Sequence, residues 1–142
     1  MNANINNLFA GSLWDESCLV GIDILDQQHK NFFSMLDELA YLNRLDNKRE
    51  EVLQLLNKFE EYTIYHFNTE EKYMDKTDYP DIEKHKNLHK LFTKRIEDFK
   101  IAYGYDNKVI LEEMISYTRK WMLVHIRVVD IHTTFDKGLI TE

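Results

Sequence analysis

The sequence predicts an all-α fold: an up-down-up-down antiparallel four-helix bundle with an irregular N-terminal arm. The chain of 142 residues has only four glycines and one proline, which leaves little turn material for a multi-stranded sheet. Apolar residues recur every three or four positions in four long segments, and the short loops between them make consecutive helices antiparallel. We expect a single domain over residues 1–142, with the arm at 1–22, the bundle at 23–136 and a tail at 137–142.

The first two helices are each predicted from a start signal and an apolar stripe. Asp23 can cap the first helix, which should end between residues 43 and 46. Residues 47–50, Asn-Lys-Arg-Glu, have the form of a capping box that opens the second helix, which should run to about Lys76. The inward stripe of the first helix is Leu25, His29, Phe32, Leu36 and Leu39. The inward stripe of the second helix is Val52, Leu55, Phe59, Tyr62, His66 and Glu70.

The third and fourth helices are predicted in the same way. Pro80 suits the first position of the third helix, which should close at residues 103–105. Asp106 or Asn107 can cap the fourth helix, which should fade between residues 136 and 138. The inward stripe of the third helix is Ile82, His85, His89, Phe92, Ile96 and Phe99. The inward stripe of the fourth helix is Ile110, Met114, Tyr117, Trp121, His125 and Val128.

Composition and charge exclude several classes of partner. The net charge of −7 argues against nucleic acid and against an anionic membrane, both of which require a basic face. The single cysteine permits no internal disulfide and fits a reducing compartment. The first 11 residues contain no lysine, no arginine and no long apolar run, so we expect no signal peptide. We therefore expect a cytoplasmic protein that binds neither nucleic acid nor membrane.

Histidines are concentrated on the predicted inward stripes. Five of the six histidines fall there, at least one on each helix. His66 and Glu70 are four residues apart, so they share one face of their helix, and His85 and His89 repeat that spacing. One inward histidine alone is more often a hydrogen-bonded core residue than a ligand. Because buried polar groups need partners and these stripes offer few besides one another, we expect a shared metal site.

Asp130 adds a second candidate carboxylate. It follows His125 by five residues, a spacing that does not stack the two side chains in an α-helix, and a carboxylate that reaches sideways to a second ion would explain the offset. The inventory of five imidazoles and two carboxylates suits two metal ions better than one, with a position left for a small molecule. Nitrogen and oxygen ligands without thiolate favour iron and leave zinc, copper and manganese open. The candidate metal ligands are His29, His66, Glu70, His85, His89, His125 and Asp130.

These motifs resemble the hemerythrin family, in particular its single-domain bacterial members, over nearly the whole chain. Members of that family are established up-down-up-down bundles. The resemblance is carried by Trp14, by residues 20–22 and 26–29, by His66, Phe67, Glu70, Glu71 and Met74, by residues 79–80 and 85–89, and by Trp121, His125, Ile126 and Asp130.

The resemblance implies two non-haem iron ions joined by an oxo or hydroxo bridge. By matching positions, His85, His89 and His125 would hold one iron, and His29 and His66 would hold the other. Glu70 and Asp130 would be the two bridging carboxylates. It implies reversible dioxygen binding as a carrier, store or sensor, without enzymatic activity, and makes nitric oxide and azide further candidate ligands. The expected oxygen pocket is Phe67, Trp121, Ile126 and Val128, with Phe32 and Phe92 nearby. Gln28 is expected to fix an imidazole tautomer as an acceptor.

Two other functions stay open at this stage. A di-iron oxidase, peroxidase or nitric-oxide-handling protein could use the same bundle, although the Glu-x-x-His spacing of carboxylate-rich di-iron proteins does not occur in the chain. A metal-free interaction bundle would leave the inward histidines unexplained. Thr133 stands where many family members carry tyrosine, so we expect faster autoxidation, which should slow in a Thr133→Tyr variant if this residue is the cause.

Overall fold

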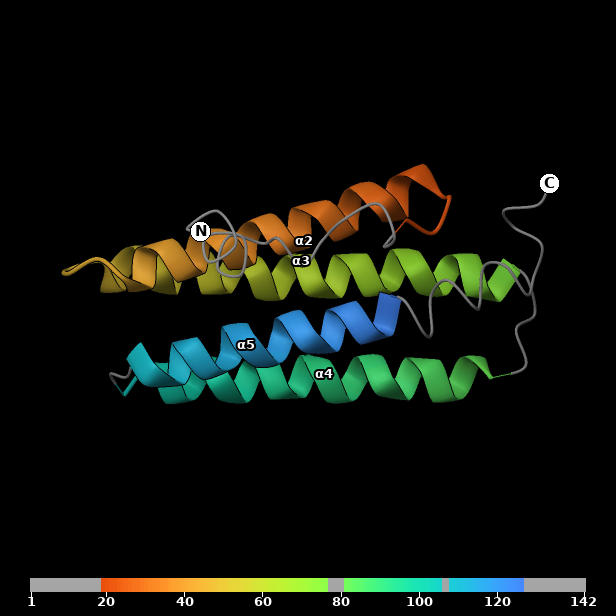
Figure 1. Cartoon of the computed structure of the whole chain (residues 1–142). Helices are drawn as coiled ribbons and strands as arrows, with labels where there is room; N and C mark the ends of the chain where they lie inside the picture. Colours follow the sequence, from red (N-terminus) through yellow and green to blue (C-terminus); the bar gives the residue numbers. More distant parts are fainter. Residues whose placement is uncertain (1–18, 77–80, 106–107, 127–142) are drawn as a thin grey trace.

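The computed structural model describes residues 19–76, 81–105 and 108–126. This part of the chain contains four long helices and no strand: α2 (Asp23–Asn43), α3 (Arg49–Lys76), α4 (Ile82–Tyr103) and α5 (Lys108–Val124). Each helix contacts two others, so that α2 and α4 both pack against α3 and α5. Consecutive helices run in opposite directions along the bundle (Figure 1). The predicted up-down-up-down architecture is confirmed.

The antiparallel order determines where the histidines meet. One end of the bundle gathers the N-terminal halves of α2 and α4 and the C-terminal ends of α3 and α5 (Figure 1). His29 lies in the N-terminal half of α2, and His66 lies in the C-terminal half of α3. The topology therefore brings inward histidines from different helices to the same end. None of the helices within the described ranges is long and apolar enough to cross a membrane.

The start of α2 differs from the prediction in its capping residue. The helix begins at Asp23, and the extended residue before it, Ile22, makes no side-chain capping bond. Asp26 in the first turn instead holds the residues that precede the helix: its carboxylate accepts hydrogen bonds from the backbone N–H groups of Val20 (2.7 Å) and Gly21 (3.2 Å). Gly21 has a φ of 89°, a conformation that glycine adopts without strain. The predicted Asp23 cap is wrong, because Asp23 is already the first helical residue and Ile22, which has no polar side chain, occupies the capping position.

Removal of these hydrogen bonds gives the first testable prediction. Asp26→Ala should lower the free energy of unfolding by about 1 kcal/mol, the net contribution of a typical hydrogen bond. Asp23→Ala, which removes an exposed carboxylate in the same first turn, is the matched control and should cost less than about half of that. Urea denaturation of the metal-free proteins measures both losses. Equal losses for the two variants would contradict a stabilising role of the hydrogen bonds to Asp26.

The start of α3 also differs from the prediction, by one residue. The backbone carbonyl of Lys48 accepts the N–H of Val52 at 2.9 Å, and the helix begins at Arg49. Asn47 has a φ of 60°, a left-handed conformation that asparagine tolerates better than most residues, whereas a capping residue is extended. The predicted capping box, with Asn47 as the cap, is therefore wrong. Arg49 instead donates to the carbonyls of Tyr103 and Gly104 at the end of α4.

The remaining boundaries are partly outside the described residues. The helix α4 begins at Ile82, with Asp81 as the residue before it. Pro80, Asp106 and Asn107 lie outside the described residues, as do Trp14 and the whole segment after residue 126. The α-helical part of α5 ends at Val124, and His125 and Ile126 continue it as a π-helical turn.

The core below the histidines consists of large apolar side chains from all four helices. Phe32 is fully buried, with ring centroids 4.8 Å from Phe59 and 6.3 Å from Phe92. Within the described residues, which do not include Val128, the predicted stripes are all buried or half-buried. On α3 the position between Phe59 and His66 is filled by the buried Thr63, while the predicted Tyr62 is half-buried. This apolar section leads directly into the histidine layer, because Phe32 also lies 6.5 Å from the ring of His66.

Candidate metal centre

Glu70 is the centre of a buried cluster at this end of the bundle. Its Oε1 atom faces three imidazole nitrogens from α4 and the end of α5. The distances to Oε1 are 2.9 Å from Nε2 of His85, 2.9 Å from Nε2 of His89 and 3.2 Å from Nε2 of His125. The Nε2 atoms of His89 and His125 are themselves 3.1 Å apart. One carboxylate oxygen and three imidazoles thus form a compact group, which we call the three-histidine group.

The other oxygen of Glu70 faces a second group. Its Oε2 atom lies 3.7 Å from Nε2 of His66 and 3.9 Å from Nε2 of His29. These two rings pack edge to face, with centroids 4.6 Å apart. In both groups the potential ligand atoms lie within 4.8 Å of one another. Glu70 therefore divides its two oxygens between the three-histidine group and this two-histidine group.

Burial sets the protonation of the cluster. Glu70 and the five histidines are each at most 3% exposed. Burial lowers the pKa of His66 from 6.5 to about 3, against the attraction of the Glu70 carboxylate. Burial alone would raise the pKa of Glu70, but hydrogen bonds from His125 and His85 hold it well below its usual range. The site therefore combines an anionic carboxylate with at least one neutral imidazole, the form in which histidine binds metals.

A chain of hydrogen bonds fixes the tautomer of His66. Its Nδ1 lies 2.8 Å from Oε1 of Gln28. The amide nitrogen of Gln28 donates to the hydroxyl of Thr69 (3.3 Å), which in turn donates to the carbonyl of Tyr65 (3.0 Å). Because this chain leaves the amide oxygen as an acceptor, His66 must donate from Nδ1. Its Nε2 then carries a lone pair directed at the cluster. The predicted contact of Gln28 with an imidazole is confirmed.

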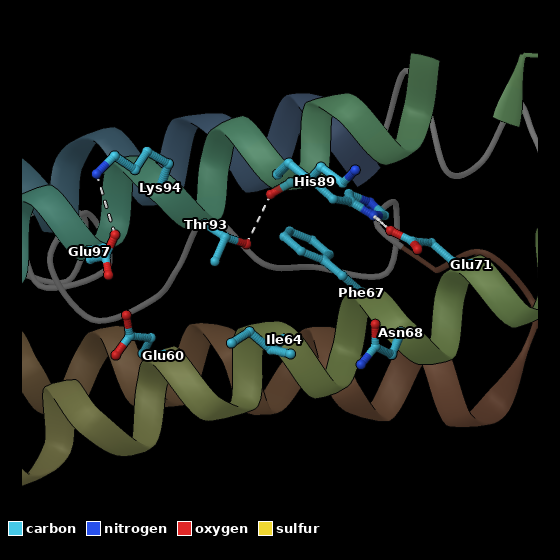
Figure 2. A pocket seen from close by; sticks show the side chains of 10 residues that line it. Glu60, Ile64, Phe67, Asn68, Glu71, His89, Thr93, Lys94 and Glu97 are labelled. Carbon is cyan, nitrogen blue, oxygen red and sulfur yellow. Dashed lines mark hydrogen bonds and ion pairs between the residues drawn. The ribbon is translucent and has the colours of Figure 1, made fainter. Parts of the chain in front are cut away.

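A carboxylate fixes the tautomer of His89 in the same way. Nδ1 of His89 lies 2.7 Å from Oε2 of Glu71, and Figure 2 shows this pair at the edge of a groove between α3 and α4. A carboxylate accepts, so Nδ1 donates and Nε2 carries the lone pair. Sequence reasoning did not find this role of Glu71. No spacing rule pairs residues 71 and 89, because they lie on different helices.

These tautomers make the cluster a site that fits a cation. The lone pair of Nε2 of His89 points at Oε1 of Glu70 from 2.9 Å, so two acceptors face each other. Among the described residues, Nε2 of His66 and Oε2 of Glu70 have no hydrogen-bond partner. Converging acceptors of this kind are satisfied by a metal ion in each group. Imidazole and carboxylate ligands without thiolate suit iron, and a carboxylate shared by both groups suits a pair of ions.

Aromatic rings cover the cluster on one side. The ring of Phe67 stacks on His89, with centroids 3.8 Å apart and planes within 2° of parallel. Trp121 stacks on His125 at 4.5 Å and meets Phe67 edge to face at 5.9 Å. Ile126 is fully buried. Phe67 and Trp121 therefore lie against the three-histidine group, and Ile126 is the next residue after His125; Val128 is outside the described residues.

Six of the seven predicted metal ligands meet in this cluster. They are His29, His66, Glu70, His85, His89 and His125. The seventh, Asp130, lies outside the described residues, as does Thr133. Phe32 and Phe92 were predicted to lie near the pocket. The ring centroid of Phe32 is 6.5 Å from that of the ligand His66, and Phe92 stacks on the pocket residue Trp121 with centroids 4.1 Å apart.

The hydrogen bond of Gln28 to His66 gives the second prediction. Gln28→Ala should weaken metal binding about 10–100-fold, because His66 loses the acceptor that orients its ring. Gln27→Ala changes the exposed neighbour and should leave metal affinity unchanged. Titration of the metal-free proteins with Co(II) against a competing chelator measures both affinities. A Gln28→Ala variant that binds as tightly as the Gln27→Ala control would show that the hydrogen bond has no such effect.

Comparisons with known proteins agree with this geometry. Residues 20–130 match the family described as the Hemerythrin HHE cation binding domain. The chain is 31% identical over 117 residues to a bacteriohemerythrin of Stenotrophomonas maltophilia, a match that covers 81% of this chain and 74% of the relative. It is 26% identical over 117 residues to a myohemerythrin of Theromyzon tessulatum, covering 82% and 86%. A crystal structure of a hemerythrin point mutant superposes with a TM-score of 0.73 at 26% identity, covering 83% of this chain and 90% of the other.

Proposed function

Because the chain belongs to the hemerythrin family, we propose that the cluster around Glu70 is its functional site. The function is reversible binding of dioxygen at a non-haem di-iron centre, and proteins of this family are oxygen carriers and sensors rather than enzymes. The observation that carries the assignment to this cluster is the division of the two Glu70 oxygens between a three-histidine and a two-histidine group. A ligand set of this kind provides for two ions that share one carboxylate.

The proposed ligands follow from this division. His85, His89 and His125 would hold one iron, His29 and His66 the other, and Glu70 would bridge them. The short distances from Oε1 and the longer distances from Oε2 support one ion position on each side of the carboxylate. When bound, the two irons supply the electrons that reversible dioxygen binding needs.

Asp130 is proposed as the second bridging carboxylate. It lies within the range that matches the family and follows His125 by five residues. The end of α5 is π-helical at His125 and Ile126. A π-helical turn closes between residues i and i+5, so residues five apart lie closer to one face there than they do in an α-helix. The π-helical turn at His125 therefore supports a shared site for His125 and Asp130.

The role of Asp130 can be tested by metal content. Asp130→Asn should lower the iron content from two ions per chain toward one, because an amide is a weaker ligand than a carboxylate. Asp136→Asn, which changes another carboxylate of the same C-terminal segment, is the control and should retain two ions. Elemental analysis of purified protein gives the stoichiometry. Two ions in the Asp130→Asn variant would contradict the proposal.

The protein's own side chains have two tasks in this function. Gln28 and Glu71 accept the Nδ1 protons of His66 and His89 and so hold both Nε2 lone pairs toward the centre. Phe67 and Trp121 stack on His89 and His125 and exclude water from that side. Exclusion of water and of stray protons favours release of the bound gas over side reactions. These contacts support reversible binding.

An optical experiment tests the function. The iron-loaded protein in air should show a visible charge-transfer band that disappears under vacuum and returns with air. Irreversible bleaching with turnover of a substrate would favour a di-iron oxidase or peroxidase, and iron-free protein would contradict the di-iron centre.

Nitric oxide and azide are proposed as further ligands that change the same band. A cytoplasmic location, consistent with the single cysteine, is part of the proposal.

A further inference from the structure

One histidine of each group has an outer hydrogen-bond partner that the structure describes, and the two partners differ in charge. His89 donates from Nδ1 to the carboxylate of Glu71 at 2.7 Å. His66 donates from Nδ1 to the neutral amide of Gln28 at 2.8 Å. Similar distances thus join one imidazole to an anionic acceptor and the other to a neutral acceptor. The imidazole with the anionic acceptor, His89, belongs to the three-histidine group, and the imidazole with the neutral acceptor, His66, belongs to the two-histidine group.

The difference in charge has a direct consequence for the ligands. Hydrogen bonds to a charged acceptor are roughly twice as strong as neutral ones. A carboxylate on the outer nitrogen of a ligating imidazole raises its basicity and thus its hold on a metal ion. We propose that Glu71 is a positioning residue that makes the two ion positions unequal, so that the three-histidine group fills first and holds its ion more tightly. This inference rests on the proposed two-ion centre.

The surroundings of Glu71 leave its charge effective. Glu71 lines a groove of about 450 Å³ between α3 and α4, together with Phe67, Asn68 and His89 (Figure 2). The groove has two lysines, Lys90 and Lys94. Lys94 pairs with Glu97 at 3.4 Å and with Asp98 at 3.3 Å, and among the described residues neither lysine forms an ion pair with Glu71. The carboxylate of Glu71 is directed to His89 instead.

The same position makes Glu71 suitable for substitution. Its side chain is 22% exposed and forms part of the groove wall (Figure 2), so a replacement opens no cavity in the core. Gln28, by contrast, is 3% exposed and is held by Thr69 and by the hydroxyl of Tyr62, which donates to its backbone carbonyl. Effects of Glu71 variants on metal binding can therefore be separated from effects on folding.

The experiment is an anaerobic titration of the metal-free full-length chain with Co(II) against a competing chelator. The wild type should bind two ions with unequal affinity. Glu71→Gln keeps an acceptor without the charge and should weaken the tighter position about 10-fold, and Glu71→Leu, which removes the acceptor, about 100-fold. Glu61→Gln, an exposed carboxylate on the same helix, is the matched control and should change neither affinity. Thermal unfolding of the metal-free variants should match the wild type.

A spectroscopic measurement separates positioning from a purely structural role. The proton NMR resonance of the imidazole Nδ1–H of His89 in the Co(II)-loaded protein should shift in Glu71→Gln and exchange faster with solvent. Two bound ions with unchanged affinities in both Glu71 variants would overturn the inference and leave the proposed function intact. Weakening of only the looser position would overturn it as well. Failure of the wild type to bind two ions would instead overturn the proposed function.

Discussion

Replacing Glu70 with glutamine is expected to abolish the di-iron centre. Glu70 offers one oxygen to each histidine group, and both oxygens face lone pairs of Nε2 atoms. Glutamine would remove the negative charge and turn an NH₂ group toward one set of these lone pairs, where it would donate hydrogen bonds and exclude a cation. The iron content should fall from two ions per chain to less than one, and the band that depends on air should disappear.

The matched control for this variant lies on the same helix. Glu61→Gln makes the same chemical change at an exposed position of α3 and should retain both irons and the optical band. Circular dichroism of both metal-free proteins checks that the helices are intact. A Glu70→Gln variant that keeps two irons and a reversible band would show that the bridge is not formed by Glu70.

The largest loss of stability is expected from Phe32→Ala. Phe32 is fully buried and its ring packs against Phe59 and Phe92, so truncation removes a large apolar side chain and leaves a cavity. The free energy of unfolding of the metal-free protein should fall by about 3–5 kcal/mol. Use of the metal-free protein keeps the stabilisation by bound ions out of the comparison. Chemical denaturation measures the loss.

Two further variants are controls for the loss of stability expected in Phe32→Ala. Leu91→Ala truncates an apolar side chain that is 68% exposed, and it should change the free energy of unfolding by less than about 0.5 kcal/mol. Phe32→Leu keeps most of the volume and should recover a large part of the stability. A loss below about 1 kcal/mol for Phe32→Ala would contradict the position of this ring in the core.

The sequence by itself determined the helices and the inward placement of the metal ligands. The period of 3.6 residues is a local property of the chain, so the spacing of apolar residues shows which face of each helix is buried. His29, His66 and His125 were assigned to inward faces on this basis, and all three are buried. The i, i+4 pair of His66 and Glu70 likewise follows from the geometry of one helix. Resemblance to a family added the division of the ligands between two irons.

Only the tertiary structure decided the helix caps and the outer partners of the histidines. The caps predicted at Asp23 and Asn47 were wrong, because the capping positions are taken by Ile22 and Lys48, and the left-handed conformation of Asn47 is not that of a capping residue. The partner of His66 on α2 and the partner of His89 on α3 depend on how each helix is rotated and how far it is shifted along the bundle. Packing of the whole core sets these two quantities, and no spacing within a single helix contains them.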